Sequence, residues 1–404
     1  MRRCFPRCRL RLTTTLALVL LASAAGAAKE IPAFPGAEGF GSTTPGGRGG
    51  RVIAVTSLDD DGPGSLRAAC EAKGPRMVVF RVGGTIRLRK HLRITEPFIT
   101  IAGQTAPGGG VLLRDAGMWI ETHDVVVRFI RVRYGPSLNE YYGSADAVHV
   151  EGKDCYNDII DHCSFSWSID EVASVCGPSH DVTYSWNIIA EGLKTPFTNA
   201  ELGKDEKEPR SHSMGMMLGN DPDRCSIHHN LLLHSDTRMP RIQGGVHAFV
   251  NNVVFDWRYR TATFTHDPKV NFIGNYYKRG PASMDLLPVI SEDSIGRIYA
   301  MGNISNRRPN DSLPNWELTV DGPADKTQAR EPFPTAPLTT TSAEQAYEDV
   351  LARVGCAIPR LDAVDIRLLR DTRLGMGGQI DRPEQVGGFP EIAGELAVQS
   401  QRLG

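Results

Sequence analysis

The sequence predicts an all-β fold, a right-handed parallel β-helix, from three observations. Strand-like segments with apolar residues at every second position recur through the 404-residue chain. Most of these segments run into an Asn that is followed by one or two apolar residues. The anchor positions recur at intervals of 22 to 28 residues, apart from one interval of 43. Such a period is typical of a solenoid that adds one coil per repeat.

The anchors share one place in each repeat, at the end of the strand-like segment. They are Cys163, Asn187, Asn230, Asn252, Asn275 and Asn303. Asn side chains stacked at one turn can hydrogen-bond from coil to coil and satisfy polar groups that would otherwise be buried unpaired. The interval of 43 lies between Asn187 and Asn230, so we expect a long loop in that coil. The segments MVVFRVGGTIRL, FITIAGQTAPGGGVLL and DVVVRFIRVRYG are expected to form earlier coils.

The N-terminal residues have the layout of a secretory signal peptide. Five arginines precede an apolar run centred on Leu16 to Leu21, and small residues follow up to Ala27. The run is too short for a stable membrane anchor. We therefore predict a signal peptide over residues 1–27 and a secreted or periplasmic protein that is free of the membrane after cleavage. A retained anchor is the alternative.

Removal of residues 1–27 leaves 40 basic and 47 acidic residues, a formal charge of −7. This charge argues against non-specific nucleic-acid binding. An anionic ligand would need a local cluster of basic side chains or a metal ion. Six cysteines remain, and a Cys155–Cys176 disulfide and buried free thiols both stay open.

The two ends of the predicted solenoid differ from its middle. Residues 57–74 are predicted to form a loop and a short helix from about Ser65, which would cap the first coil. Near the C-terminus, Ser342 and Gln345 match a capping box that opens a helix ending at Gly355. We therefore assign residues 28–335 to the β-helix and residues 336–404 to a C-terminal helix and tail packed on its outside.

Several motifs, in order, resemble the pectate lyase family of parallel β-helix polysaccharide lyases. The pattern SWSIDEVASV, TRMPR, GNYYKRGP is most similar to a secreted bacterial branch. The resemblance covers roughly residues 32–390. The motifs are FPGAEGFG, IDHCSFSW, HSMGMMLGN, HHN, TRMPRIQGG and NNVVFDW.

The resemblance implies cleavage of polygalacturonate or a related acidic polysaccharide by β-elimination, leaving a 4,5-unsaturated uronate end. This reaction removes the proton at C5, so it needs a base and cations that neutralise the adjacent carboxylate. By the same resemblance Arg238 is the catalytic base, although a guanidinium gives up its proton reluctantly. Arg241 is expected to bind a substrate carboxylate with its two-pronged fork. Gln243 and Lys278 are further candidate substrate ligands, and we expect a monomer.

The resemblance also implies a calcium site, because hard cations prefer clustered carboxylates. Asp146 and Asp170 match two of the expected ligand positions. The third expected carboxylate, four residues after Asp170, is Ser174 in this chain. Glu171 is the candidate replacement.

Other departures keep alternatives open. The lysine expected two residues after His212 is Met214, and the second expected arginine is Gln243. A non-catalytic β-helix that binds acidic glycans is one alternative. A β-helix glycoside hydrolase, which would use paired carboxylates with water between them, is another. His162 is weighed as a base, but a structural role along a coil is the preferred interpretation.

Overall fold

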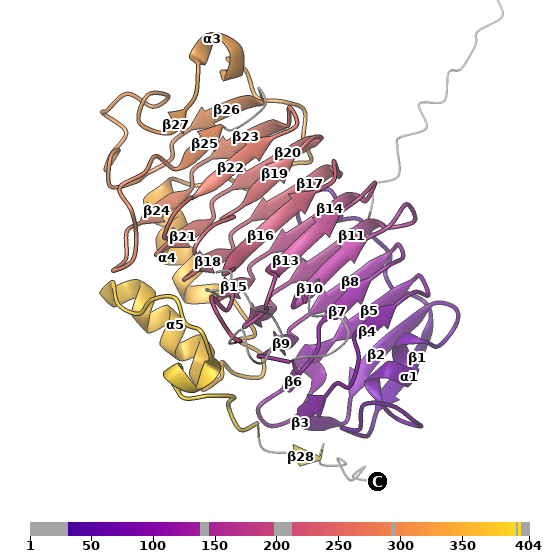
Figure 1. Ribbon diagram of the computed structural model, residues 1–404. Helices are drawn as coiled ribbons and strands as arrows, with labels where there is room; N and C mark the ends of the chain where they lie inside the picture. Colours follow the sequence, from indigo (N-terminus) through magenta and orange to yellow (C-terminus); the bar gives the residue numbers. More distant parts are fainter. Residues whose placement is uncertain (1–30, 138–144, 198–211, 292–295, 393–394, 397–404) are drawn as a thin grey trace, which may run out of the picture. The chain divides into compact units, whose positions relative to one another are not determined.

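Each turn of the chain contributes strands to three parallel sheets, which stack into a parallel β-helix (Figure 1). The computed structural model describes residues 31–137, 145–197, 212–291, 296–392 and 395–396. From Pro32 onward the chain forms one compact unit. The predicted fold class is confirmed, while the predicted signal peptide lies outside the described residues.

The three sheets follow one another within each coil. Sheet 1 contains β1 (Arg51–Val55), β2 (Arg76–Phe80), β5 (Ile99–Ala102), β8 (Val125–Arg128), β11 (Tyr156–Asp161), β14 (His180–Ser185), β17 (Asp223–His228), β20 (Val246–Val250), β23 (Lys269–Ile273) and β26 (Arg297–Met301). Sheet 2 contains β3 (Val82–Arg87), β6 (Val111–Arg114), β9 (Arg131–Arg133), β12 (Ser164–Ser166), β15 (Ile188–Ala190), β18 (Leu231–Leu233), β21 (Val253–Phe255) and β24 (Tyr276–Lys278), with β28 (Glu395–Leu396) antiparallel on β3. Sheet 3 contains β4 (Leu92–Ile94), β7 (Met118–Ile120), β10 (Val148–Glu151), β13 (Glu171–Cys176), β16 (Met214–Gly219), β19 (Arg241–Gln243), β22 (Ala262–Thr265), β25 (Val289–Ser291) and β27 (Val320–Asp321).

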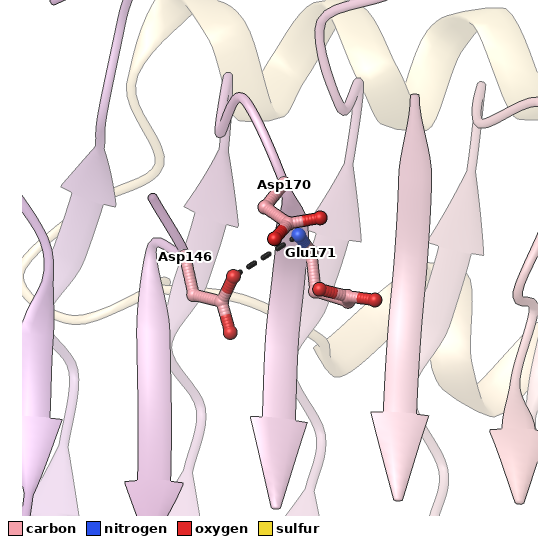
Figure 2. A group of neighbouring side chains, drawn as sticks. All are labelled: Asp146, Asp170 and Glu171. Atoms are coloured by element: carbon pink, nitrogen blue, oxygen red, sulfur yellow. Dashed lines mark hydrogen bonds between the residues drawn. The ribbon is translucent and has the colours of Figure 1, made fainter. Parts of the chain in front are cut away.

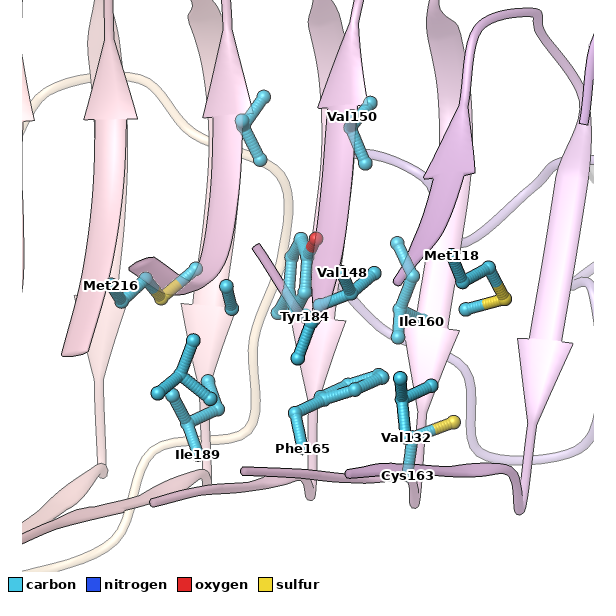
Figure 3. Packing of buried hydrophobic residues seen from close by; sticks show 14 of the residues in the cluster. Met118, Val132, Val148, Val150, Ile160, Cys163, Phe165, Tyr184, Ile189 and Met216 are labelled. Atoms are coloured by element: carbon cyan, nitrogen blue, oxygen red, sulfur yellow. The ribbon is translucent and has the colours of Figure 1, made fainter. Parts of the chain in front are cut away.

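The core lies inside the solenoid, where alternate side chains of all three sheets meet (Figure 3). Val148 of sheet 3, Ile160 of sheet 1 and Phe165 of sheet 2 are all fully buried there. The same alternation sends the intervening side chains of sheet 3 outward. Met216 therefore packs in the core, whereas its neighbour Met217 is partly exposed on the outside. This outer face of sheet 3 carries the candidate site.

The predicted Asn stack is confirmed at the turn between sheets 1 and 2. Each Asn side-chain amide donates to the Asn of the next coil, over 3.0 Å from Asn187 to Asn230 and 3.0 Å from Asn230 to Asn252. The stack continues through Asn275 to Asn303. The bonds between buried amides run along the solenoid and hold successive coils in register.

A second ladder occupies the same turn, one residue before the Asn stack. Phe129, His162, Trp186 and His229 all have a positive φ, between 51° and 56°, and their rings stack from coil to coil. His162 also lies 2.7 Å from its neighbour Asp161 through Nδ1. This turn joins sheets 1 and 2 and does not border sheet 3. The contacts of His162 within the ladder therefore agree with a structural role.

The helices are short and lie at the ends or on the outside of the solenoid. They are α1 (Leu66–Cys70), α3 (Ala324–Thr327), α4 (Ala343–Arg353) and α5 (Ala363–Leu374), with 3₁₀ turns η1 (Gly103–Thr105) and η3 (Pro383–Val386). The helix predicted from about Ser65 is α1, and the Ser65 side chain accepts from the Ala68 N–H. Ser342 likewise caps α4, but the Gln345 side chain donates to Asp349 instead of completing the capping box.

The N-terminal strap, residues 33–50, crosses the outer face of sheet 1. The backbone N–H of Phe40 donates to Ser226 over 3.1 Å, and that of Gly41 donates to Thr183 over 2.9 Å. A Cβ on Gly41 would lie 2.1 Å from the carbonyl oxygen of Asp158, so this position requires glycine. Close backbone packing thus explains Gly41, the last residue of the FPGAEGFG motif.

The C-terminal helices cover the outer face of sheet 2 (Figure 1). Leu368 of α5 and Val350 of α4 pack against sheet-2 residues such as Leu231. Arg133 of β9, fully buried, donates to Asp362 over 2.8 Å and to Asp365 over 2.9 Å. The sequence did not predict α5 as a helix. The C-terminal segment belongs to the same compact unit as the solenoid, and the division at residue 335 stays a prediction.

All six cysteines after residue 27 are free and buried, so the possible Cys155–Cys176 disulfide is not formed. Among the described residues, no helix combines the length and the hydropathy needed to cross a membrane.

Candidate active site

The candidate site lies where the strands of sheet 3 begin. Asp146 precedes β10, while Asp170 precedes β13 and Glu171 opens it (Figure 2). Each of the three carboxylates offers an oxygen within 4.8 Å of those of the other two. The strands β10 and β13 lie on neighbouring coils and pair in parallel. Residues about 25 positions apart in the sequence, such as Asp146 and Glu171, therefore lie side by side. The structure therefore brings together the three predicted metal ligands.

The carboxylate cluster fits a hard cation. Asp146 and Glu171 are buried, and Asp146 Oδ1 accepts the backbone N–H of Glu171 over 3.1 Å (Figure 2). Burial raises the pKa of Asp146 above its usual range, and the negative charge of Asp170 acts in the same direction, although His149 opposes both. Crowded oxygen donors that repel one another are the ligand set that Ca²⁺ takes.

Ser174 stands where the resemblance implied a third carboxylate, and its hydroxyl makes close contacts there. Its hydroxyl donates to Asp146 Oδ2 and lies 2.6 Å from Nδ1 of His149. The His149 ring also lies 2.9 Å from Asp146 through Nδ1 and 3.0 Å from Glu151 through Nε2. Burial lowers the pKa of His149, but the hydrogen bonds to Asp146 and Glu151 outweigh it and raise the pKa to about 9.

Sequence reasoning missed His149. A signal was available, because His149 follows Asp146 by three residues and the coil period places it beside Ser174. A protonated His149 supplies a positive charge behind Asp146. The carboxylate cluster is therefore partly neutralised from within the protein.

Arg238 faces the carboxylate cluster from the next coils. Its guanidinium forms an ion pair with Glu171, and its Nη1 donates to the sulfur of Met217 over 3.4 Å. The residue adopts a positive φ of 57° immediately before Met239 and the cis Pro240. Burial lowers the pKa of Arg238, and the positive charge of Arg241 lowers it further, against the opposite effect of Asp170.

Arg241 and Gln243 lie on the same face of β19, two residues apart. Arg241 pairs in register with Met217 and with Thr263. Within the described part of the chain, its buried Nε has no hydrogen-bond partner. Gln243 accepts the Asn220 N–H over 2.9 Å and donates to Thr265 over 3.3 Å. Among the predicted substrate ligands, Arg241 is thus the one with a guanidinium N–H that lacks a hydrogen-bond partner among the described residues.

Lys278 is not brought to this cluster. It ends β24 in sheet 2, where its ammonium donates to the carbonyls of Thr372 over 2.8 Å and Arg373 over 2.9 Å, at the end of α5. The Tyr347 hydroxyl accepts a third bond over 3.1 Å. These bonds hold the C-terminal helices, so a substrate-binding role for Lys278 stays a prediction without geometric support.

The comparisons with known proteins agree on one family. A probable pectate lyase C of Emericella nidulans is 34% identical over 392 residues, covering 95% of this chain and 85% of the relative. A probable pectate lyase C of Aspergillus fumigatus is 38% identical over 272 residues, covering 66% of this chain and 59% of the relative. Both relatives are fungal, so they do not support a specifically bacterial branch.

Solved structures agree with the fold. The major allergen from cedar pollen matches with a TM-score of 0.57 at 18% identity, over 79% of this chain and 92% of that one. A pectate lyase from Bacillus sp. N165 in complex with trigalacturonate matches with a TM-score of 0.53 at 19% identity, over 80% and 99%.

No protein-family model matches the chain. The identity to the Emericella nidulans relative extends over almost the whole sequence, and the same parallel β-helix underlies the solved structures. The chain belongs to the pectate lyase family of parallel β-helix polysaccharide lyases.

Proposed function

We propose that this protein is an exported, calcium-dependent lyase that cleaves polygalacturonate or a related acidic polysaccharide by β-elimination. The observation that carries the proposal is the position of Arg238, which faces the carboxylates of Asp146, Asp170 and Glu171 from the neighbouring coils. The relatives named pectate lyase support the reaction class.

The reaction divides into steps that the residues can serve. Asp146, Asp170 and Glu171 would hold calcium, which supplies, when bound, a positive charge that neutralises a uronate carboxylate. Arg241 would bind a carboxylate through its guanidinium and so make the C5 proton more acidic. Arg238 would take that proton, after which the bond between C4 and the linking oxygen breaks, its electron pair leaves with the oxygen, and a C4–C5 double bond forms.

Export, a monomeric state and freedom from the membrane belong to the same proposal. The arginines before the apolar run at Leu16 to Leu21 support export. Both ends of the solenoid are contacted by helices, α1 at β1 and α3 at β26, which limits edge-to-edge association.

The test follows ultraviolet absorbance of unsaturated uronate ends, with purified mature protein and polygalacturonate, with calcium or with a chelator. Arg238→Ala is compared with Arg297→Ala, an exposed arginine of sheet 1. We expect a calcium-dependent rise that is lost in Arg238→Ala and kept in Arg297→Ala. Saturated products would favour a glycoside hydrolase. Binding without any product would identify a non-catalytic glycan-binding protein.

A further inference from the structure

A row of arginines lies on the outer face of sheet 2, near the start of the solenoid. Arg87 ends β3, Arg114 ends β6 and Arg133 ends β9, and these strands follow one another on successive coils (Figure 1). The parallel register places the three arginines side by side. Neighbouring strands lie about 4.8 Å apart, so three positive charges are crowded together. Arg133 is neutralised by Asp362 and Asp365.

Arg87 and Arg114 have only one carboxylate between them. Each donates through its Nε to Asp115, over 2.9 Å from Arg87 and 3.0 Å from Arg114. Among the described residues, neither arginine makes a hydrogen bond through its Nη atoms. Two guanidinium charges facing one carboxylate leave an excess positive charge, with N–H groups that can bind a second anion.

These two arginines line a cavity of about 700 Å³ between the solenoid and the C-terminal tail. Two further charged side chains line it besides Asp115. Arg89 forms ion pairs with Asp60 and Asp61. Glu384 of the tail is exposed and forms no ion pair with any described residue. Because water and salt screen an exposed charge, Glu384 opposes an anion in the cavity only weakly.

The C-terminal tail holds one arginine of the cavity in place. The Arg114 guanidinium lies 3.5 Å from the centre of the Phe389 ring. Phe389 packs edge-on against Trp167, with ring centroids 5.1 Å apart. A Cβ on Gly135, whose φ is +80°, would lie 2.5 Å from this ring, so the tail approaches the solenoid closely. A guanidinium that is already oriented loses little conformational entropy when it binds an anion.

The cavity and the carboxylate cluster lie along one turn of the solenoid. Asp115 follows β6 and Ser137 follows β9, where the chain passes from sheet 2 to sheet 3. Asp146 lies in the same turn and the same coil as Ser137, and Asp170 lies in that turn of the next coil. A polymer that follows this turn would therefore meet the arginine cavity and the carboxylate cluster in succession.

We propose that the cavity at Arg87 and Arg114 binds a uronate carboxylate of the polysaccharide chain that is being cleaved, away from the cleaved linkage. A polyuronate carries a carboxylate on every sugar, and a planar guanidinium matches its geometry. Once the chain is held at the carboxylate cluster, the second contact forms within one complex and strengthens binding without touching the reacting atoms. The inference rests on the proposed lyase function and adds a binding site to it.

The test compares KM and kcat on long polygalacturonate and on trigalacturonate, which is too short to occupy both sites. Arg87→Gln should raise KM for the polymer about fivefold, the upper range for one exposed ion pair, with kcat and the trimer values unchanged. Glu384→Gln should lower KM for the polymer, because it removes a negative charge from the cavity. Arg81→Gln is the matched control, since Arg81 is exposed and lies just before the other end of β3.

A binding measurement does not depend on turnover. Calorimetry with calcium, on proteins that also carry Arg238→Ala, should show the same fivefold loss of polymer affinity for Arg87→Gln. Equal polymer KM and affinity for Arg87→Gln and Arg81→Gln would overturn the inference, and so would an equal loss on polymer and trimer. Neither result would affect the lyase function. Absence of unsaturated products from the wild-type protein would overturn the proposed function, while calorimetry would still test the cavity.

Discussion

The ion pair between Arg238 and Glu171 allows stability and activity to be separated. The Glu171 side chain is 3% exposed and the Arg238 side chain 22%. Arg238→Ala would leave a buried carboxylate without its cation. Loss of one partner of a buried pair costs about 3–5 kcal/mol, and the partial exposure of Arg238 places the expected loss near 3 kcal/mol. Loss of a general base should lower kcat by about 10²–10⁴-fold.

The double variant Arg238→Ala with Glu171→Gln distinguishes the two effects. It removes the unpaired charge, so about 2 kcal/mol of the lost stability should return. Activity should not return, because the base is still missing. Urea unfolding in the presence of a chelator measures the first quantity, and the uronate absorbance assay with calcium measures the second.

Two results would refute this reasoning. If the double variant is as unstable as Arg238→Ala, the cost did not arise from an unpaired Glu171. If Arg238→Ala keeps wild-type kcat, Arg238 is not the base. Glu171→Gln alone serves as the matched control, since it isolates the effect of the lost carboxylate on calcium dependence.

Two further predictions concern the solenoid itself. Asn230→Ala should lower the free energy of unfolding by about 4 kcal/mol and Asn303→Ala by about 3. The two N–H groups of Asn230 are shared among three acceptors and its oxygen accepts two bonds, whereas Asn303 donates one bond and accepts two. If urea titrations gave the same loss of unfolding free energy for both variants, stability would not follow the number of hydrogen bonds that each Asn makes. His247 is buried, and burial lowers its pKa to about 4 from an unfolded value near 6.5. The folded protein therefore binds fewer protons, so stability is full above about pH 6.5 and falls by roughly 3 kcal/mol toward pH 4. His247→Gln should flatten this part of the curve, and an unchanged slope would assign the acid sensitivity to other groups.

The sequence by itself determined the solenoid and its register. A repeat with period-2 alternation encodes which side chains face inward, and the Asn positions mark the same turn in every coil. The interval between Asn187 and Asn230 predicted a long loop, and residues 198–211 between β15 and β16 lie outside the described residues. The family resemblance, and not the repeat, marked Asp146 and Asp170 as a pair, and their carboxylates do lie close together in the structure.

Only the tertiary structure decided how those positions are used. Lys278 looked available in the sequence, but its ammonium is bound by the end of α5. Arg133 and Asp362, 229 residues apart, meet because the C-terminal helices fold back along sheet 2. His149 lies beside Ser174, the residue that stands in place of the expected third carboxylate. Its raised pKa of about 9 makes the imidazole a positive charge at this position. A repeat specifies contacts between neighbouring coils, whereas contacts with segments outside the repeat depend on how the whole chain packs.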